Sequence, residues 1–417
     1  MNPINPSILA DDPLLHRVWD QLGRPEACSV VGGYVRDRLL GRPSNDLDLT
    51  IDGDDDAAAG PAHRLGKAFG VRPHLLGTPP HRIWRIETSK FKIELWPLGG
   101  LSQDDDILRR DFTCNALSWE LPHGPLVDLV GGIEDIEGRR LRAVSRSNLE
   151  DDPVRLLRGP RFLAQLIDFE LDERTRRWIV DLAPSLEGAP RERVGQELLT
   201  LLSAQASARG LKECLDQGLF VPAAPPTCAV DAVWLRAHLD AADHLNCHPN
   251  AGGTQARCRS GDPLDAARLA LLFRAWGLPS ERDVAPYSWQ KAVRDDGLRA
   301  AFMLAEAQTA VKAAAADRRE FAWRAGSAFP SLIALAMAIE SQNPGWARWL
   351  RQWHLNRSAI EDPQPLLTGN EIAKIVGIDP GPELGEVVRG LLRAQVRGEI
   401  RSRGGAVRWL ERHSESR

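Results

Sequence analysis

Paired cysteines, long apolar runs and an excess of basic residues are all lacking in this sequence. Its 6 cysteines show no C-x-x-C spacing, so the sequence indicates neither a zinc site nor a disulfide framework. Cys247 and Cys258 flank His248, and a metal site at these three residues is the alternative. No apolar run is long enough to cross a bilayer, and the N-terminal residues lack a basic region followed by an apolar run. We therefore expect no membrane span and a cytoplasmic protein.

The formal net charge of −4 at pH 7 is unlike that of a protein that coats nucleic acid without specificity. Any contact with RNA must therefore come from local basic patches. The sequence contains two such patches, one formed by Arg139, Arg140, Arg142, Arg146, Arg155, Arg158 and Arg161 and the other by Arg389, Arg393, Arg397, Arg401 and Arg403. The plainer interpretation of each patch is a solvated helix face.

Length and patterning indicate an α/β unit followed by helical domains. A chain of 417 residues is too long for one compact core, and its 43% hydrophobic and 26% charged residues are ordinary for a globular protein. Short β-like runs occupy the first third, at residues 28–31, 47–51, 83–87, 91–96 and 116–120. From about Asp151 onward, apolar residues recur at helical spacing and strand signals fade. Breaks fall at residues 222–226, 246–263 and 362–369.

A glycine pair follows the first β-like run. Gly32 and Gly33 open a helical segment that Gly41 would end at its C′ position. Glycine lets backbone N–H groups approach a phosphate closely, and the start of a helix adds further donors and a favourable dipole. A glycine pair by itself is more often a tight turn, so this interpretation depends on its partners downstream.

Two carboxylates follow on the next β-like run. Asp46 and Asp48 are two residues apart, so they project from one face of a strand while the leucines between and after them point into the core. Adjacent like charges need a cation, and Mg²⁺ prefers carboxylate oxygens and substrate phosphates, which indicates phosphoryl transfer. Glu94, on an expected neighbouring strand, would complete a three-carboxylate cluster. The alternatives are a charged strand edge, an outward-facing Glu94, or the D-x-D pair of a metal-dependent glycosyltransferase.

Arginines dominate the two remaining motifs. Arg109 and Arg110 precede Asp111 directly before a β-like run, and arginine forks bind triphosphate or ribose oxygens bidentately. For at least one of the two arginines, a structural pair with Asp111 is the alternative. Asp152 and Pro153 are typical of a helix N-cap and its first residue. The helix predicted to follow is either a plain amphipathic helix or a binding element, and it carries one basic stripe, Arg155, Arg158 and Arg161.

Together, four motifs in this order and spacing resemble the tRNA nucleotidyltransferase and bacterial poly(A) polymerase family, the class II group of the polymerase-β-like nucleotidyltransferases. They are GGYVRDRLLG at residues 32–41, NDLDL at 45–49, LRRDFTCNAL at 108–117 and DDPVRLLRGPRF at 151–162. The resemblance covers residues 28–220 well and extends to shorter segments at 366–369 and 380–385. It implies an α/β nucleotidyltransferase head, a mixed sheet with helices, at residues 1–145. An all-α neck, body and tail would follow at residues 146–221, 222–361 and 362–417.

The resemblance also implies a role for each motif. Asp46 and Asp48 would hold Mg²⁺, with Glu94 as a further catalytic carboxylate. Asp152 and Arg155 would select the base, because a carboxylate accepts a hydrogen bond from the exocyclic amine of cytosine or adenine, which uracil lacks. The incoming CTP or ATP would contact four more residues, Gly32, Gly33, Arg36 and Arg110. Two further arginines would support the triphosphate or the base-reading pair, Arg158 and Arg161.

The acceptor that the resemblance implies is the 3′ end of a tRNA. Its terminal hydroxyl would attack the α-phosphate of CTP or ATP in line and release pyrophosphate, and the protein rather than a template strand would choose the nucleotide. Near the C-terminus, Arg389, Arg393 and Arg397 fall at i, i+4 and i+8 and form one stripe, which we expect to follow the tRNA backbone by charge and shape.

Three departures from the family pattern affect the details. Asp151 stands where the family usually has Glu. The segment from Glu94 to Arg109 is short compared with that of full CCA-adding relatives, whose longer loop helps to switch from C to A addition, so the CC-adding branch is one option. Phe273 and Arg274 occupy the His-Asp positions of an HD-phosphohydrolase helix, so we expect no hydrolase activity.

Other functions compatible with the motifs remain open at the level of sequence. A poly(A) polymerase of the same family would share every motif, because both enzymes must read the adenine edge. A catalytically silent RNA-binding protein on the same scaffold would be expected to lack a carboxylate or an arginine, yet all are present. A D-x-D glycosyltransferase would lack the paired arginines and the Asp152–Arg155 pair.

Overall fold

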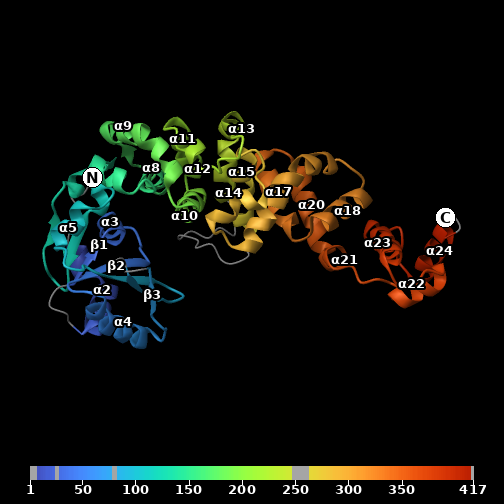
Figure 1. The fold of residues 1–417 in the computed structure, drawn as a ribbon, viewed down its shortest axis with the longest axis horizontal. Helices are drawn as coiled ribbons and strands as arrows, with labels where there is room; N and C mark the ends of the chain where they lie inside the picture. Colours follow the sequence, from blue (N-terminus) through green and yellow to red (C-terminus); the bar gives the residue numbers. More distant parts are fainter. Residues whose placement is uncertain (1–6, 24–27, 78–81, 247–262, 415–417) are drawn as a thin grey trace. The chain divides into compact units, whose positions relative to one another are not determined.

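The computed structural model describes residues 7–23, 28–77, 82–246 and 263–414 of the chain. The alternative metal ligands Cys247, His248 and Cys258 lie outside these residues. The chain divides into two compact units (Figure 1). The N-terminal unit comprises Met1–Ala189 and Asp216–Leu219, and the C-terminal unit comprises Pro190–Leu215 and Phe220–Arg417.

The N-terminal unit is built on a mixed sheet of seven strands in the order β3-β4-β5-β2-β1-β6-β7. The strands are β1 Cys28–Val31, β2 Asp46–Ile51, β3 His74–Leu76, β4 Ile83–Glu87, β5 Lys92–Pro97, β6 Leu117–Glu120 and β7 Leu126–Asp128. Neighbouring strands are antiparallel except for β2 and β5, which are parallel. The five β-like runs of the sequence are thereby confirmed to within one residue, as is the predicted α/β head with a mixed sheet.

Strand β2 lies at the centre of this sheet, between β1 and β5. Leu47 and Leu49 are fully buried, whereas Asp46 and Asp48 alternate with them and are only partly covered. Because hydrogen bonds to both neighbours fix the backbone of β2, the two carboxylates keep a constant direction from one face of the strand.

Helices and short strands complete the N-terminal unit (Figure 1). The helices are α1 Ser7–Ala10, α2 Pro13–Leu22, α3 Gly33–Leu39, α4 Asp55–Phe69, α5 Gln103–Leu108, α6 Gly132–Glu137, α7 Arg146–Asp151, α8 Arg155–Gln165 and α9 Glu173–Leu182, with 3₁₀ turns η1 Thr113–Asn115 and η2 Ala183–Gly188 and a two-stranded pair β8 Arg140–Leu141 and β9 Glu170–Leu171. Helix α3 ends as predicted, since Gly41 follows the C-cap Leu40 with a φ of +69°.

The prediction that Asp152 is a helix N-cap is wrong. Helix α7 ends at Asp151, and α8 begins only at Arg155, with Val154 at its N-cap position. The backbone N–H of Arg155 donates to the Asp152 carbonyl (2.9 Å), so a tight turn separates the two helices. The Asp-Pro pattern is local, and it does not reveal the helix that precedes it and that has Asp152 as its C-cap.

Among its described residues, the C-terminal unit contains helices and no strand. Its helices are α10 Arg191–Leu202, α11 Ser207–Asp216, α12 Phe220–Ala223, α13 Ala232–Ala237, α14 Leu239–Asn246, α15 Pro263–Ala275, α16 Glu281–Val284, α17 Lys291–Ala310, α18 Ala315–Ala325, α19 Phe329–Ile339, α20 Pro344–Leu355, α21 Arg357–Glu361, α22 Gly369–Val376, α23 Pro382–Arg397 and α24 Arg403–Ser414, with 3₁₀ turns η3 Ala285–Tyr287 and η4 Gly326–Ala328. Helices α15, α17 and α19 pack against one another as its main core. The expected all-α character after the head is confirmed except for the short strand β9, which lies in the expected neck and pairs with β8 of the head.

One helical run in the described part of the chain is long and apolar enough to cross a bilayer by length and composition. It extends over Ala315–Ile339, and 56% of its most apolar window is buried. This run differs from the expectation that no apolar run is long enough to cross a bilayer. A core helix passes the same test, and Phe329, Leu332 and Leu335 of this run are fully buried among the other helices.

The HD-like segment of the sequence lies in α15. Phe273 is fully buried and packs its ring against Trp276 and Trp289. The Arg274 guanidinium lies 5.3 Å from the centre of the Trp234 ring. The two positions that would carry the His-Asp pair therefore serve packing.

Candidate active site

Pairing between β2 and β5 brings the third predicted carboxylate next to the first two. The parallel register sets Glu94 opposite Asp48 and Lys92 opposite Asp46. Glu94 is 7% exposed, so it lies in the sheet and is not an outward-facing surface residue. This neighbour relation follows from strand order, which the sequence motif alone does not specify.

Cations of the protein occupy the space around Glu94. The Lys92 ammonium lies 3.3 Å from Glu94 Oε1 and 3.9 Å from Asp46 Oδ1. The antiparallel register of β4 and β5 sets Arg85 opposite Glu94, and both the Nε and Nη2 of Arg85 contact the same Oε1, at 2.9 and 2.6 Å. Among the described residues, no three His, Cys, Asp or Glu side chains are arranged to hold a metal together. Glu94 is thus placed to balance charge beside the aspartates.

Burial and neighbouring negative charge raise the pKa of Asp48. Burial, and next the neighbouring Glu94 carboxylate, raise the pKa of Asp48 from 3.8 to about 6, while Arg110 and Lys92 act in the opposite direction. An acid in this position is poorly solvated when charged, and a divalent cation would compensate it. The pair Asp46 and Asp48 fits such an ion, because two carboxylates together with substrate phosphates are the usual protein site for it.

Gly32 lies where the chain passes from β1 into α3, at the N-cap of that helix. Its φ is +75°, and a Cβ built there would lie 2.7 Å from Arg110 Nη1 and 3.6 Å from Asp48 Oδ2. The absence of a side chain therefore lets Arg110 cross the turn close to Asp48. Gly33 is the first residue of α3, so the turn also offers the unpaired backbone donors of a helix start.

Arg110 is held in this position by the helix that precedes it, α5. Its Nε and Nη2 both contact Asp106 Oδ2, at 3.0 and 2.7 Å, four residues earlier. Its Nη1 faces the Gly32 turn and donates to the Asn115 carbonyl (3.5 Å). Asp106 thus fixes one edge of the guanidinium and leaves the other edge toward the turn, which suits an arginine that binds phosphate oxygens.

Arg36 lies in a buried network instead of an open pocket. It is 6% exposed, its Nε donates to Asp37 Oδ1 (2.9 Å), and its Nη1 donates to Asn115 Oδ1 (2.5 Å). Asn115 Nδ2 in turn donates to Asp111 Oδ1 (3.4 Å). The predicted contact between Arg36 and the nucleotide stays a prediction.

Asp111 connects this network to helix α8. Arg158 Nη1 lies 2.8 Å from Asp111 Oδ2, and the backbone N–H of Phe112 donates to Asp111 Oδ1 (2.7 Å). Although burial opposes ionisation, Arg158 and the other contacts hold the pKa of Asp111 below its usual range. Of the two alternatives weighed for the Arg-Arg-Asp motif, Arg110 faces the glycine turn, and Asp111 pairs with the more distant Arg158.

Phe162 was not singled out from the sequence, yet it is a shared neighbour of three predicted site residues. The guanidinium carbons of Arg161, Arg36 and Arg158 lie 4.2, 5.4 and 5.8 Å from the centre of its ring. Cations above an aromatic face are attracted to it, so Phe162 helps to keep like charges together. The signal in the sequence was a phenylalanine directly after the arginine stripe.

The predicted base-selecting pair adjoins the Arg-Arg-Asp segment. Arg155 Nε lies 3.6 Å from Asp152 Oδ2, and both side chains are 22% exposed. Arg155 Nη1 donates to the carbonyls of Arg109 (2.8 Å) and Asn148 (3.0 Å). The third and fourth sequence motifs, about forty residues apart, are therefore bonded to each other.

Ion pairs within the C-terminal unit engage part of the predicted stripe Arg389, Arg393 and Arg397. Arg393 lies 2.5 Å from Glu320 Oε1, and Arg397 lies 2.7 Å from Asp317 and 2.6 Å from Glu320. Arg389 is exposed on the same helix, α23. Two of the three arginines thus join α23 to α18.

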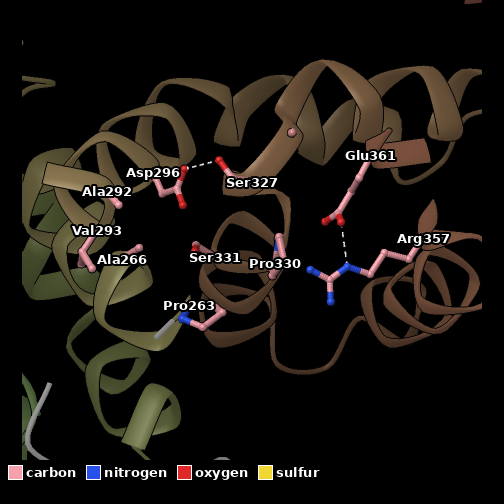
Figure 2. Close-up of a pocket in the computed structure, with 11 residues that line it drawn as sticks. Pro263, Ala266, Ala292, Val293, Asp296, Ser327, Pro330, Ser331, Arg357 and Glu361 are labelled. Atoms are coloured by element: carbon pink, nitrogen blue, oxygen red, sulfur yellow. Dashed lines mark hydrogen bonds and ion pairs between the residues drawn. The ribbon is translucent and has the colours of Figure 1, made fainter. Parts of the chain in front are cut away.

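A cavity of about 390 Å³ also lies in the C-terminal unit (Figure 2). Its carboxylates are already engaged: Asp296 accepts a hydrogen bond from Ser327 (2.7 Å), and Glu361 from Arg357 (2.7 Å). None of the residues predicted to bind nucleotide or metal line it. The strand carboxylates of the N-terminal unit are therefore the better candidate.

Acids that can hold a divalent cation, beside a backbone turn and an arginine that can hold phosphates, are what transfer of a nucleotidyl group requires. The fold and this site together define a nucleotidyltransferase, a class of enzyme that uses divalent metal ions.

Comparison with known proteins specifies the family. Residues 28–142 match the family described as "Poly A polymerase head domain", and residues 168–229 match "Probable RNA and SrmB- binding site of polymerase A". The A-adding tRNA nucleotidyltransferase of Deinococcus radiodurans is 30% identical, covering 93% of this chain and 96% of that protein. The CC-adding tRNA nucleotidyltransferase of Geobacter sulfurreducens is 28% identical, covering 91% and 90%. The chain belongs to the tRNA nucleotidyltransferase family.

A solved structure agrees in fold. The crystal structure of the Bacillus stearothermophilus CCA-adding enzyme in complex with CTP superposes with a TM-score of 0.76 at 24% identity, and the match covers 97% of this chain and 98% of that one. The similarity extends over the helical part as well as the head.

Proposed function

We propose that this protein adds nucleotides from CTP or ATP to the 3′ end of tRNA without a template. The observation that carries the proposal is the bond from Arg155 to the Arg109 carbonyl, because it sets the base-reading pair beside the phosphate-binding segment. Relatives named as CC-adding and A-adding tRNA nucleotidyltransferases, aligned over almost the whole chain, support the same acceptor.

In this proposal, the metal ion is Mg²⁺, held by Asp46 and Asp48. When bound, it supplies charge compensation for the attacking hydroxyl and for the leaving pyrophosphate. Arg110 and the Gly33 amide bind the triphosphate, with Arg36 in support. The Gly32 N–H already donates to the Leu117 carbonyl (3.1 Å), so Gly32 contributes the room that its missing side chain leaves. Glu94, held by Lys92 and Arg85, sets the local charge.

Base choice rests on Asp152 and Arg155, supported by Arg158 and Arg161. Asp152 accepts a hydrogen bond from the exocyclic amine of cytosine or adenine, and Arg155 donates to a ring acceptor on the same edge. Uracil presents a carbonyl where the amine would be, so it leaves Asp152 without a donor. Exclusion of an analogue that lacks a required hydrogen-bonding group is the stronger kind of specificity.

We propose CC addition as the product. Strand β5 ends at Pro97 and α5 begins at Gln103, so only residues 98–102 connect them. A connection this short leaves little chain for the flexible loop that full CCA-adding relatives use to switch to adenosine.

The test is to incubate the purified protein and Mg²⁺ with tRNA transcripts that end at the discriminator base, at C or at CC. CTP and ATP are supplied separately and together, and the 3′ ends are sequenced. Addition that stops at CC supports the proposed product. Completed CCA ends would show that the short connection suffices for the switch, a single A on CC ends would make it A-adding, and long A tails on unrelated RNA would favour a poly(A) polymerase.

Mg²⁺ is expected to stabilise the protein more at about pH 7.5 than at about pH 5. Since burial and Glu94 raise the pKa of Asp48 to about 6, the folded metal-free protein loses stability as the pH rises from 3.8 toward that value. Above about pH 6, Asp48 is charged beside Glu94 and Asp46, and Lys92 and Arg110 compensate this charge only in part. Bound Mg²⁺ would compensate the rest. Below about pH 6, the ion must first displace a proton.

Thermal unfolding with MgCl₂ and with EDTA at both pH values measures this effect, and the rise in Tm should be larger at the higher pH by roughly 3 °C. Asp48→Asn should remove the difference between the two pH values. Equal shifts at both pH values in the unmodified protein would contradict the proposed ion site.

Arg389→Glu is expected to weaken tRNA binding without lowering Tm, whereas Arg397→Glu should lower Tm, because it sets a third acid beside Asp317 and Glu320. Loss of one phosphate contact should make the slope of log K against log salt shallower by about one. Filter binding at several salt concentrations measures this. Unchanged affinity of Arg389→Glu at physiological salt would mean that the stripe Arg389, Arg393 and Arg397 is a solvated and structural face.

We also propose the four-part division at residues 1–145, 146–221, 222–361 and 362–417, with the last part contacting tRNA, and a cytoplasmic location. The comparisons support a head and an adjoining RNA-binding segment at 28–142 and 168–229. Limited proteolysis with mass spectrometry would locate the boundaries.

A further inference from the structure

The carbonyls at the end of helix α5 are bound by the segment that carries the base-selecting pair. Helix α5 ends at Leu108, with Arg109 as its C-cap, and the last carbonyls of a helix need partners from outside it. Asn148 Nδ2 donates to the carbonyls of Leu108 (2.8 Å) and Arg110 (2.7 Å). Arg155 Nη1 donates to the carbonyl between them, that of Arg109.

Asn148 is itself firmly placed. It is 7% exposed and lies in the first turn of α7, where its backbone N–H donates to the side chain of the N-cap Ser145 (3.1 Å). Its backbone carbonyl accepts the second hydrogen bond of Arg155 Nη1 (3.0 Å). Both neighbours of its side-chain nitrogen are carbonyl oxygens, so that atom must be the amide NH₂.

This arrangement decides which edge of Arg155 is available. Arg155 Nη1 donates to two backbone carbonyls, and Asn148 fixes both. One is the carbonyl of Asn148 itself, and the other, that of Arg109, lies between the Leu108 and Arg110 carbonyls that Asn148 Nδ2 binds. Within the described part of the chain, Arg155 Nε makes no hydrogen bond, and its nearest acidic group is Asp152 Oδ2 at 3.6 Å, an ion pair too long for a hydrogen bond. A buried donor left without an acceptor costs free energy, and a base edge would provide the acceptor.

We propose that Asn148 is a positioning residue for nucleotide choice, acting through Arg155. It ties the base-selecting arginine to the backbone that carries Arg110, so the base and the triphosphate are read at a fixed separation. The inference rests on the proposed function. Asp, which has the same shape as Asn, offers only acceptors when ionised, and Ser offers one donor.

The experiment compares Asn148→Asp and Asn148→Ala with the unmodified protein. Asp keeps the shape but turns oxygens toward the carbonyls of Leu108 and Arg110, whereas Ala removes the amide without that repulsion. Steady-state rates on a tRNA acceptor give kcat/KM for the nucleotide that the protein adds, CTP or ATP, and for UTP. The ratio of kcat/KM for the added nucleotide to kcat/KM for UTP should fall by about tenfold in Asn148→Asp and by less in Asn148→Ala. A tenfold change is roughly the effect of losing one hydrogen bond, here one that keeps Arg155 in place.

Two further variants calibrate the result. Arg155→Ala sets the largest loss of discrimination that the pair can show. Asn246→Asp is the matched control, because Asn246 Nδ2 also donates to backbone carbonyls, those of Leu202 (3.0 Å) and Ala204 (2.8 Å), in the C-terminal unit. It should lower Tm and leave the nucleotide ratio unchanged.

If both nucleotides lose the same factor in Asn148→Asp and Asn148→Ala, Asn148 supports only the fold and the inference is overturned, while the proposed function stands. Should Asn148→Asp not fold, Asn148→Ala alone decides by the same ratio. A wild-type protein that adds neither C nor A to any tRNA end would overturn the proposed function itself, and the inference with it.

Discussion

Replacing Asp48 by Asn is expected to abolish nucleotide transfer while making the metal-free protein more stable. The neutral amide cannot hold a divalent cation as a carboxylate does, so kcat/KM should fall by at least about a thousandfold. The same change removes a charge that burial and Glu94 oppose, because they raise the pKa of Asp48 to about 6. Activity and stability should therefore change in opposite directions.

The measurements are primer extension on a tRNA acceptor and thermal unfolding in EDTA at about pH 7.5, where Asp48 of the unmodified protein is charged. Asp46→Asn should also abolish transfer. Asp52→Asn is the control, since Asp52 is exposed just beyond the same strand and its Oδ1 accepts a local hydrogen bond from the Gly53 N–H (2.8 Å). Normal turnover in both Asp46→Asn and Asp48→Asn would rule out the proposed metal site.

Asp111→Asn should cause the largest loss of stability of any change at the site. The Asp111 carboxylate is 4% exposed and faces Arg158 at 2.8 Å. Removing one partner of a buried ion pair leaves the other charge uncompensated, and because Arg158 is partly exposed we expect a loss of about 2 to 3 kcal/mol in the free energy of unfolding. Transfer should weaken as well, because Asp111 also holds Asn115, the partner of Arg36.

Denaturant unfolding of Asp111→Asn and of the exposed control Asp104→Asn measures this difference. Because Arg158 and neighbouring donors hold the pKa of Asp111 below its usual range, the stabilisation is complete above the ordinary aspartate pKa. It should disappear as the pH falls through the lowered value, so the two proteins should converge in acid. A constant difference at all pH values would assign the loss to packing instead of charge.

Local patterns predicted the strands that matter for the site. Alternating leucines and aspartates identified β2, and apolar runs identified β1, β4, β5 and β6. Strands β3, His74–Leu76, and β7, Leu126–Asp128, were missed because each has only three residues, none of them fully buried, so no burial pattern marks them. The cap assigned to Asp152 failed for a related reason, since a local motif does not show where the preceding helix ends.

Partners that come from distant parts of the chain could not be predicted in the same way. The pairing of Glu94 with Arg85 depends on the register of β4 against β5, and the pairing of Arg397 with Glu320 depends on how α23 packs on α18. Asn148 was overlooked because its function lies in two hydrogen bonds to a segment about forty residues earlier. Residue types within the motifs were enough to indicate chemistry, whereas these contacts needed the fold.

The tight crossing at Gly32 also limits how this enzyme can diverge. Alanine at this position would place its methyl group 2.7 Å from the Arg110 guanidinium, on a backbone with a φ of +75° that disfavours any side chain. Arg110 would have to withdraw from Asp48, which would separate the acid proposed to hold the cation from the arginine proposed to bind phosphates. Gly32 is thus restricted by geometry, because a methyl group there would meet Arg110 unless the guanidinium moves and would sit on a backbone that disfavours any side chain.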